Sequence, residues 1–270
     1  MQKRAQSAQP AQTTCAAGSS GRNLCCVHDG SGQRPRRVWA RDDTTQRRHR
    51  WRTASIDQAV LNDYSLDKIK TMTGPFNPAA ERNKTPILQA IAPYLTRAST
   101  VLELGAGSGQ HALYFASQLP HLRWQATDQP DNLAGLLRNL ATPALPNLAV
   151  PIALDVLMQP WPWRELDAIF AANVVQCMAW EAVAAMFGGV AAALAADGVF
   201  LLYGPFNRDG CFTSDGNQQL DAWARSLDGR FGLRDRAALE TLAGQHHLRL
   251  CDDHNMPANN QLLCWRRCDP

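Results

Sequence analysis

Long apolar runs are missing from this 270-residue sequence. No stretch of 18 consecutive apolar residues occurs, so we expect no transmembrane helix and no membrane partner. Eight cysteines are present, but no paired C-x-x-C arrangement has zinc spacing, so we expect no metal site. Their scatter favours reduced thiols in a cytoplasmic protein. With 45% hydrophobic residues, the chain can bury a full-sized core in one domain.

Acidic residues are scarce at the start of the chain. Residues 1–71 carry 13 Lys and Arg against 6 Asp and Glu, whereas residues 72–270 carry 14 against 18. The first segment also lacks helical or strand periodicity, so it predicts a basic, disordered extension. It could also be a segment outside the functional protein, and both of these interpretations are favoured over a targeting peptide. We place the boundary of the folded domain at Met72. Its mildly acidic composition gives no argument for a nucleic-acid partner.

Three glycines organise the folded part. In Val101–His111, of sequence VLELGAGSGQH, an apolar run meets Gly105, Gly107 and Gly109, and an apolar helical segment follows. The pattern predicts a buried strand, a tight turn and a helix. Glycine reaches positive φ freely and holds no Cβ against a ligand, and the N-terminus of a helix favours an anionic group. A tight turn also needs glycine where no ligand binds, so both interpretations remain open.

Two cofactor classes compete for this turn. The dinucleotide fingerprint places its third glycine three residues after the second, where this chain has Gln110. The observed spacing is instead G-x-G-x-G, preceded by Glu103. That combination resembles the first motif of the class I S-adenosylmethionine (SAM)-dependent methyltransferases. The resemblance implies that the loop holds the methionine end of SAM, with Glu103 near its ammonium group.

Acidic residues follow two further predicted strands. Asp128 ends the second strand, where an acid can accept both hydroxyls of a ribose. Asp155 ends the third strand, and the resemblance implies that it binds the adenine amino group while the N–H of Val156 serves a ring nitrogen. Each acid could instead be an ordinary helix cap or turn residue.

Strands and helices alternate along the domain and end in a hairpin. This order predicts a Rossmann-like α/β fold, a doubly wound and mostly parallel sheet with a C-terminal antiparallel hairpin. The expected strands are 101–104, 122–128, 148–154, 167–175, 199–203, 248–251 and 262–266. The expected helices are 79–95, 109–119, 133–140, 180–196, 218–227 and 235–245, with Asp197-Gly198 ending the fourth and a long turn, 252–261, inside the hairpin.

Five motifs in order support a narrower resemblance. They are NPAAERNKTPIL from Asn77, GSGQHA from Gly107, LYGPF from Leu202, GLRD from Gly232 and MPANN from Met256. Over Phe76 to Arg267 the chain resembles the methyltransferase-like 26 family, a SAM-methyltransferase-like group of unassigned substrate. Residues 1–71 fall outside the resemblance. One departure is Gln176, where the family pattern has a histidine, so a histidine base would be missing at this position.

The acceptor side is the least specified part of the site. Methyl transfer requires two reactants to be positioned in a dry site, and a neutral nucleophile also needs a proton acceptor or a polarising partner. The candidate catalytic residues are Asn173, Tyr203 and His111, with Asn173 also beside the cofactor; the candidate acceptor-binding residues are Asn83, Lys84, Gln176 and Asn207. His111 could instead hydrogen-bond locally, and Lys84 could belong to a solvated face.

The sequence therefore predicts a class I methyltransferase that uses SAM and a small-molecule acceptor. No Asn-Pro-Pro-Tyr tetrad occurs, which argues against methylation of nucleic-acid bases on nitrogen. A SAM-binding or partner-binding module with little turnover is the alternative, and an NAD-dependent oxidoreductase is disfavoured by the position of Gly109. The sequence carries no signal for an oligomeric state.

Overall fold

The computed structural model describes residues 74–141 and 145–268. By its internal contacts the chain divides into Met1–Arg52 and Thr53–Pro270, and every described residue lies in the second unit. The basic segment 1–71 and the boundary at Met72 therefore lie outside the described residues. Within the described ranges, no helix is both long enough and apolar enough to cross a bilayer.

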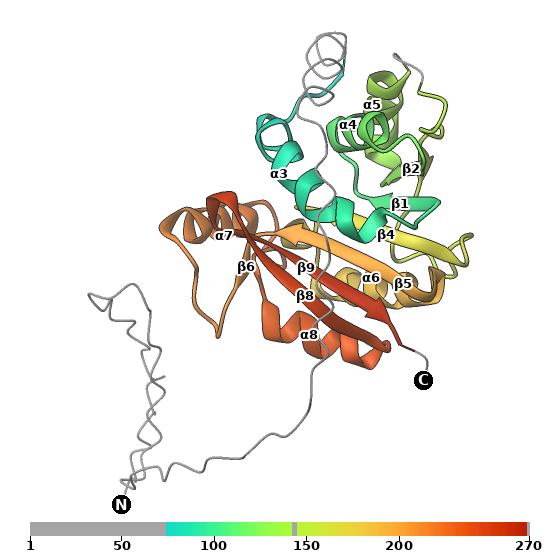
Figure 1. Cartoon of the computed structure of the whole chain (residues 1–270). Coiled ribbons are helices and arrows are strands. Elements are labelled where there is room, and N and C mark those ends of the chain that lie inside the picture. The colour runs from blue at the N-terminus through green and yellow to red at the C-terminus, as the bar shows by residue number, and fades with distance from the viewer. Residues whose placement is uncertain (1–73, 142–144, 269–270) are drawn as a thin grey trace, which may run out of the picture. The chain divides into compact units, whose positions relative to one another are not determined.

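A seven-stranded sheet forms the centre of the domain (Figure 1). Its strand order is β3-β2-β1-β4-β5-β9-β8; the strands from β3 to β5 are parallel, and β9 runs antiparallel to both β5 and β8. The strands are β1 (Thr100–Leu104), β2 (Arg123–Asp128), β3 (Ile152–Ala153), β4 (Leu166–Ala172), β5 (Leu194–Gly204), β8 (Leu248–Met256) and β9 (Asn260–Arg267). This topology confirms the predicted Rossmann-like fold with a C-terminal antiparallel hairpin.

Helices cover both faces of the sheet (Figure 1). They are α3 (Pro78–Leu95), α4 (Gln110–Gln118), α5 (Pro130–Leu140), α6 (Trp180–Ala193), α7 (Asp215–Leu227) and α8 (Arg236–Gln245). One core packs α3, α4 and α5 against inward residues such as Val101 and Phe170, and the other packs α6 and α8 against Leu102 and Phe200. Neighbouring strand residues enter opposite cores because side chains alternate along a strand. The sheet is therefore buried on both faces.

Several predicted boundaries are wrong. β4 ends at Ala172 instead of residue 175, because Asn173 adopts a left-handed conformation with φ of +55°. α6 ends at Ala193, before Asp197-Gly198, because Leu194 is already extended and pairs with Leu166 of β4. The predicted third strand, 148–154, shrinks to two residues plus a single bridge between Trp124 and Leu148.

The hairpin has longer strands and a shorter turn than expected. β8 continues through the polar residues Asp252–Asn255 to Met256, and a three-residue turn, Pro257–Asn259, joins it to β9. Ala258 and Asn259 both have positive φ, at +58° and +56°. β8 is an edge strand with several exposed positions, so its last residues lack the hydrophobic alternation that marks a half-buried strand.

Four cysteines of the described part of the chain, Cys177, Cys251, Cys264 and Cys268, are free. These four positions agree with the expectation of reduced thiols.

Candidate functional site

The glycine loop joins β1 to α4 with three glycines of positive φ. The φ angles of Gly105, Gly107 and Gly109 are +65°, +57° and +76°. A Cβ on Gly105 would lie 2.5 Å from Val174 Cγ1, and a Cβ on Gly109 would lie 2.9 Å from two leucine methyl groups of α5. A Cβ on Gly107 would meet no described atom within 4 Å. Packing therefore accounts for the outer two glycines, whereas Gly107 faces open space.

Asp128 lies beside the loop at the end of β2, as predicted. Its side chain is buried, and Oδ2 accepts a hydrogen bond from the backbone N–H of Gly107 at 2.6 Å. Its Oδ1 accepts from the backbone N–H of Gln129 at 2.7 Å and from Asn132 Nδ2 at 2.8 Å. These three bonds fix the carboxylate at the backbone N–H of Gly107. A carboxylate with two oxygens still has acceptor capacity for a ligand hydroxyl.

Asp155 and Val156 follow β3 and lie next to Asp128. The backbone N–H of Leu154 donates to the Asp128 carbonyl at 2.8 Å, which brings the ends of β2 and β3 together. Asp155 Oδ1 accepts from the backbone N–H of Leu157 at 2.9 Å, as in an Asx turn. Val156 packs against the core on the α6 side of the sheet. The two predicted adenine residues thus share one edge of the sheet with the predicted ribose residue.

Glu103 points into the core beneath α4. Its side chain is 2% exposed, and Oε2 accepts a hydrogen bond from Trp124 Nε1 at 2.8 Å. Burial raises the pKa of this carboxyl to about 8, against the opposing effect of the Trp124 hydrogen bond. Glu103 is therefore largely protonated at neutral pH. The role beside a ligand ammonium that the resemblance gave to Glu103 stays a prediction.

Asn83, His111 and Tyr203 come together from three elements. His111 Nε2 lies 2.7 Å from Asn83 Oδ1, and the Asn83 side chain lies close enough to the Tyr203 hydroxyl to oppose the effect of burial on its pKa. Burial and the nearby charge of Lys84 lower the pKa of His111 to about 4, while burial raises the pKa of Tyr203. Both groups are therefore neutral at pH 7. Since Asn83 accepts through its oxygen, the neutral imidazole carries its hydrogen on Nε2.

Lys84 is already paired within the protein. Its side chain is buried, with Nζ 2.5 Å from Glu81 Oε1 and 4.9 Å from the centre of the Tyr114 ring. A cation over an aromatic face and beside a carboxylate is stabilised by both. The interpretation of Lys84 as part of a solvated face is therefore wrong, and its charge is matched by Glu81.

Asn173 and Gln176 follow β4. The backbone N–H of Asn173 donates to the Tyr203 carbonyl at 2.9 Å, so it lies beside the end of β5. The carbonyl of Gln176 accepts from the backbone N–H of Gly232 at 2.9 Å. Gln176 Oε1 and Asn207 Oδ1 are both buried and have no hydrogen-bond partner among the described residues. Such orphaned oxygens cost about 1–3 kcal/mol each, so this part of the site is polar but incompletely satisfied.

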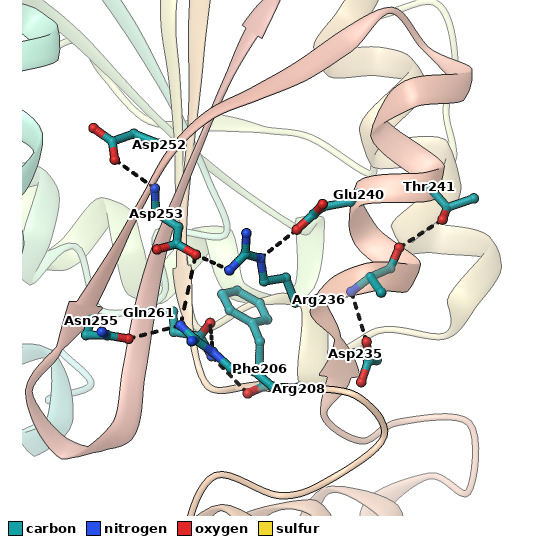
Figure 2. A network of polar contacts seen from close by, with 11 residues as sticks. Phe206, Arg208, Asp235, Arg236, Glu240, Thr241, Asp252, Asp253, Asn255 and Gln261 are labelled. Atoms are coloured by element: carbon teal, nitrogen blue, oxygen red, sulfur yellow. Dashed lines mark hydrogen bonds and ion pairs between the residues drawn. The ribbon is translucent and has the colours of Figure 1, made fainter. Parts of the chain in front are cut away.

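Asn207 lies in a short parallel ribbon. β6 (Phe206–Asn207) pairs with β7 (Arg234–Asp235). Beyond Asn207, Arg208 donates from Nε to Gln261 Oε1 at 3.0 Å and from Nη2 to Asn255 Oδ1 at 2.9 Å, as Figure 2 shows. Figure 2 also shows Asp253 between Arg208 and Arg236. These contacts tie the loop after β5 to the β8–β9 hairpin.

Arg234 is a structural residue that sequence reasoning did not single out. Its guanidinium donates to the carbonyls of Val175 and Met178, on either side of Gln176, and lies 5.9 Å from the centre of the Trp180 ring. Arg234 thereby fixes η1 (Val175–Cys177), the turn that follows β4. The GLRD motif was the available signal, but only the fold shows that it reaches the turn after β4.

The described residues contain no group of three or more His, Cys, Asp and Glu side chains that could hold a metal ion.

The polar groups at the carboxyl ends of the strands form two groups, which we call the two halves of the site. The first half lies at the ends of β1, β2 and β3 and contains Gly107, Asp128 and Asp155. The second half lies beside β5 and contains Asn83, His111 and Tyr203. An open α/β sheet binds ligands at this edge, where the strand order reverses.

Solved structures share this fold at low sequence identity. An O-methyltransferase family protein from Burkholderia thailandensis has a TM-score of 0.63 and 15% identity, covering 71% of this chain and 58% of that protein. The apo form of the S-adenosylmethionine-dependent methyltransferase SibL has a TM-score of 0.57 and 19% identity, covering 71% and 56%. PigF with SAH has a TM-score of 0.57 and 15% identity, covering 70% and 64%. The chain spans less than two thirds of the length of each of these proteins.

A family profile matches residues 74–267, which include all the strands and helices described above. The chain therefore belongs to the family described as "Protein of unknown function (DUF938)".

Proposed function

We propose that this protein binds SAM and transfers its methyl group to a small molecule. The observation that carries the proposal is Gly107, a positive-φ glycine that has open space where its side chain would be and that donates its N–H to a buried aspartate. Of the structural neighbours, SibL is described as an S-adenosylmethionine-dependent methyltransferase, and PigF was solved with SAH. Both descriptions support this choice of cofactor. The narrower resemblance to the methyltransferase-like 26 family is part of the same proposal.

The residues fit SAM in three places. The loop of Gly105, Gly107 and Gly109 would take the methionine end. Asp128 would accept the ribose hydroxyls, because its carboxylate is fixed beside Gly107. Asp155 and Val156 would take the adenine, with Asn173 bordering the cofactor on the other side and Glu103 near the ammonium group of the methionine end, as the resemblance implies. When bound, SAM supplies a methyl group that is electrophilic because it sits on a sulfonium.

The acceptor half would orient an uncharged polar molecule. His111 and Tyr203 are both neutral at pH 7, so neither is a strong base. They and Asn83 would position the acceptor by hydrogen bonds. Gln176 and Asn207 would add amide groups from the turn after β4 and from β6. Lys84 would not bind a ligand directly, because it is buried against Glu81.

A SAM-binding module with little turnover is the second candidate. It is favoured by the pKa shifts of His111 and Tyr203, which leave both groups poor proton acceptors. The presence of Gln176 where the resemblance expects a histidine points the same way. In this case the pocket would bind SAM and SAH, but methyl transfer would be slow with every acceptor.

Calorimetric titration of the full chain with SAM, SAH and NAD⁺ tests the proposal. We expect binding of SAM and SAH and none of NAD⁺. Absence of SAM binding would refute both candidate functions, and binding of NAD⁺ alone would support an oxidoreductase. The protein is then incubated with methyl-labelled SAM and a small-molecule cell extract. Labelled products absent from a heat-treated control would support an enzyme, whereas SAM binding without labelled products would favour the binding module.

A further inference from the structure

Gln110 connects the glycine loop to α3. It is 1% exposed, at the first position of α4, where the dinucleotide fingerprint has a glycine. Its Oε1 accepts from the backbone N–H of Asn77 at 2.7 Å and from Ser108 Oγ at 2.8 Å. Its Nε2 donates to Glu81 Oε2 at 3.0 Å. One side-chain amide thus holds the loop through Ser108 and the first turn of α3 through two residues.

The contacts continue along α3 to the acceptor half of the site. Glu81 uses its second oxygen to bind Lys84 Nζ at 2.5 Å. Asn83, next to Lys84, hydrogen-bonds His111 and lies close to the Tyr203 hydroxyl. α3 therefore contacts Gln110, next to the glycine loop, through Glu81, and it contributes Asn83 to the proposed acceptor half of the site. A shift of its first turns relative to the loop would change both.

Asn139 adds a second tie between the same two segments. Its side chain is fully buried, and Nδ2 donates to the carbonyls of Ser108 and Pro75 at 2.8 and 2.7 Å, while Oδ1 accepts from the N–H of Gly74 at 2.7 Å. Buried polar groups that lose their partners cost more than the hydrogen bond itself gains. The loop and the start of α3 are therefore expected to move together.

We infer that Gln110 is a positioning residue that couples cofactor binding to assembly of the acceptor half of the site. This inference rests on the proposed function. A ligand that restricts the motion of the glycine loop also restricts Ser108. Because Gln110 hydrogen-bonds Ser108, Asn77 and Glu81, the start of α3 becomes more ordered as well. The start of α3 then holds Asn83 against His111. By linkage, order in α3 favours cofactor binding to the same extent.

Hydrogen exchange of the backbone amides in residues 74–88 tests this coupling. In the wild type we expect SAM to slow exchange in this segment about tenfold, a typical size for coupling between sites. In Gln110→Met, which keeps the length of the side chain but not its polar atoms, SAM should still bind and the segment should gain no protection. Gln118→Met, at the other end of α4, is the matched control and should behave as wild type.

Two further variants separate coupling from a general loss of structure. Glu81→Ala breaks the same contact from α3, on a side chain that is partly exposed, and should also abolish the added protection. The double variant Glu81→Gln with Gln110→Glu exchanges the donor and the acceptor of the hydrogen bond between positions 81 and 110. It should restore the protection that SAM adds. Equal protection in the wild type, Gln110→Met and Glu81→Ala would overturn the inference while SAM binding stood. Failure of SAM to bind the wild type would instead overturn the proposed function, and the inference with it.

Discussion

Substitution of Gly107 tests the open side of the glycine loop. In Gly107→Ala the new Cβ meets no described atom within 4 Å, so no steric clash is expected in the folded protein. The remaining cost is that of an L-residue at φ of +57°, about 1–2 kcal/mol. For a domain of this size, 1 kcal/mol lowers Tm by about 2–4 °C. We therefore expect a folded protein with a slightly lower Tm.

The same substitution should remove cofactor binding, because the methyl group would occupy the space that the ligand needs. Gly107→Val, with a larger and branched side chain, should abolish binding entirely while the circular dichroism spectrum stays that of a folded protein. The measurements are a thermal melt and a calorimetric titration with SAM for each variant, under one buffer.

Gly109→Ala is the matched control. Gly109 also has a positive φ, but leucine side chains of α5 already fill the space that its Cβ would take. Its Cβ would lie 2.9 Å from methyl groups of Leu136 and Leu140, so about 1–3 kcal/mol of overpacking adds to the backbone cost. Gly109→Ala should therefore lose more stability than Gly107→Ala. Unchanged SAM affinity in Gly107→Ala would show that the loop does not approach the ligand, and equal loss of stability in the two variants would show that Gly107 is also packed.

Three other changes have defined outcomes. Asp128→Ala should weaken SAM binding by about 1–3 kcal/mol in a calorimetric titration, because it removes an acceptor for the ribose and releases the N–H of Gly107. Glu103→Gln should flatten the dependence of unfolding free energy on pH. In the wild type the folded pKa of about 8 exceeds the usual value of 4.5, so stability falls as pH rises between them, by up to about 1.4 kcal/mol per pH unit. A chain that begins at Met72 should melt and bind SAM like the full chain, since every described strand follows it.

Each of these expectations can be contradicted directly. SAM affinity within twofold of wild type in Asp128→Ala would remove the ribose assignment. Identical pH slopes in denaturant unfolding for Glu103→Gln and the wild type would mean that Glu103 is ionised in the folded protein. Loss of a cooperative melting transition in the chain that begins at Met72 would mean that the domain boundary lies earlier.

Local patterns in the sequence are sufficient to predict the class of the sheet and to propose the cofactor half of the site. The strand before Gly105, the helix after Gly109 and the acid at Asp128 each leave a signal within a few neighbouring residues. The parallel arrangement of the strands before the hairpin then follows from the alternation of strands and helices, because parallel strands need crossover connections. Once the sheet is built, residues at the carboxyl ends of its strands must share one edge. For this reason the amino-acid sequence alone places Asp128 and Asp155 together.

The acceptor half cannot be placed in the same way. Asn83 and Tyr203 are far apart in the chain, and no periodicity connects a helix before the sheet with the end of its fifth strand. Lys84 and Gln110 carry polar side chains, so their burial is invisible to a hydrophobic pattern. Arg234 binds backbone carbonyls of Val175 and Met178, which every residue type possesses. Only the folded chain reveals these partners.

The two halves of the site also differ in charge, and the difference suits the proposed reaction. In the proposed site, the carboxylates of Asp128 and Asp155 would border the cofactor half. SAM carries a sulfonium and an ammonium against one carboxylate, so it is a net cation. In the acceptor half, His111 is neutral and Lys84 is paired with Glu81, so neither leaves an uncompensated positive charge beside the sulfonium. An unpaired cation there would oppose SAM binding, because charges in a partly buried site interact strongly. The low pKa of His111 is therefore consistent with a residue that positions the acceptor while remaining uncharged.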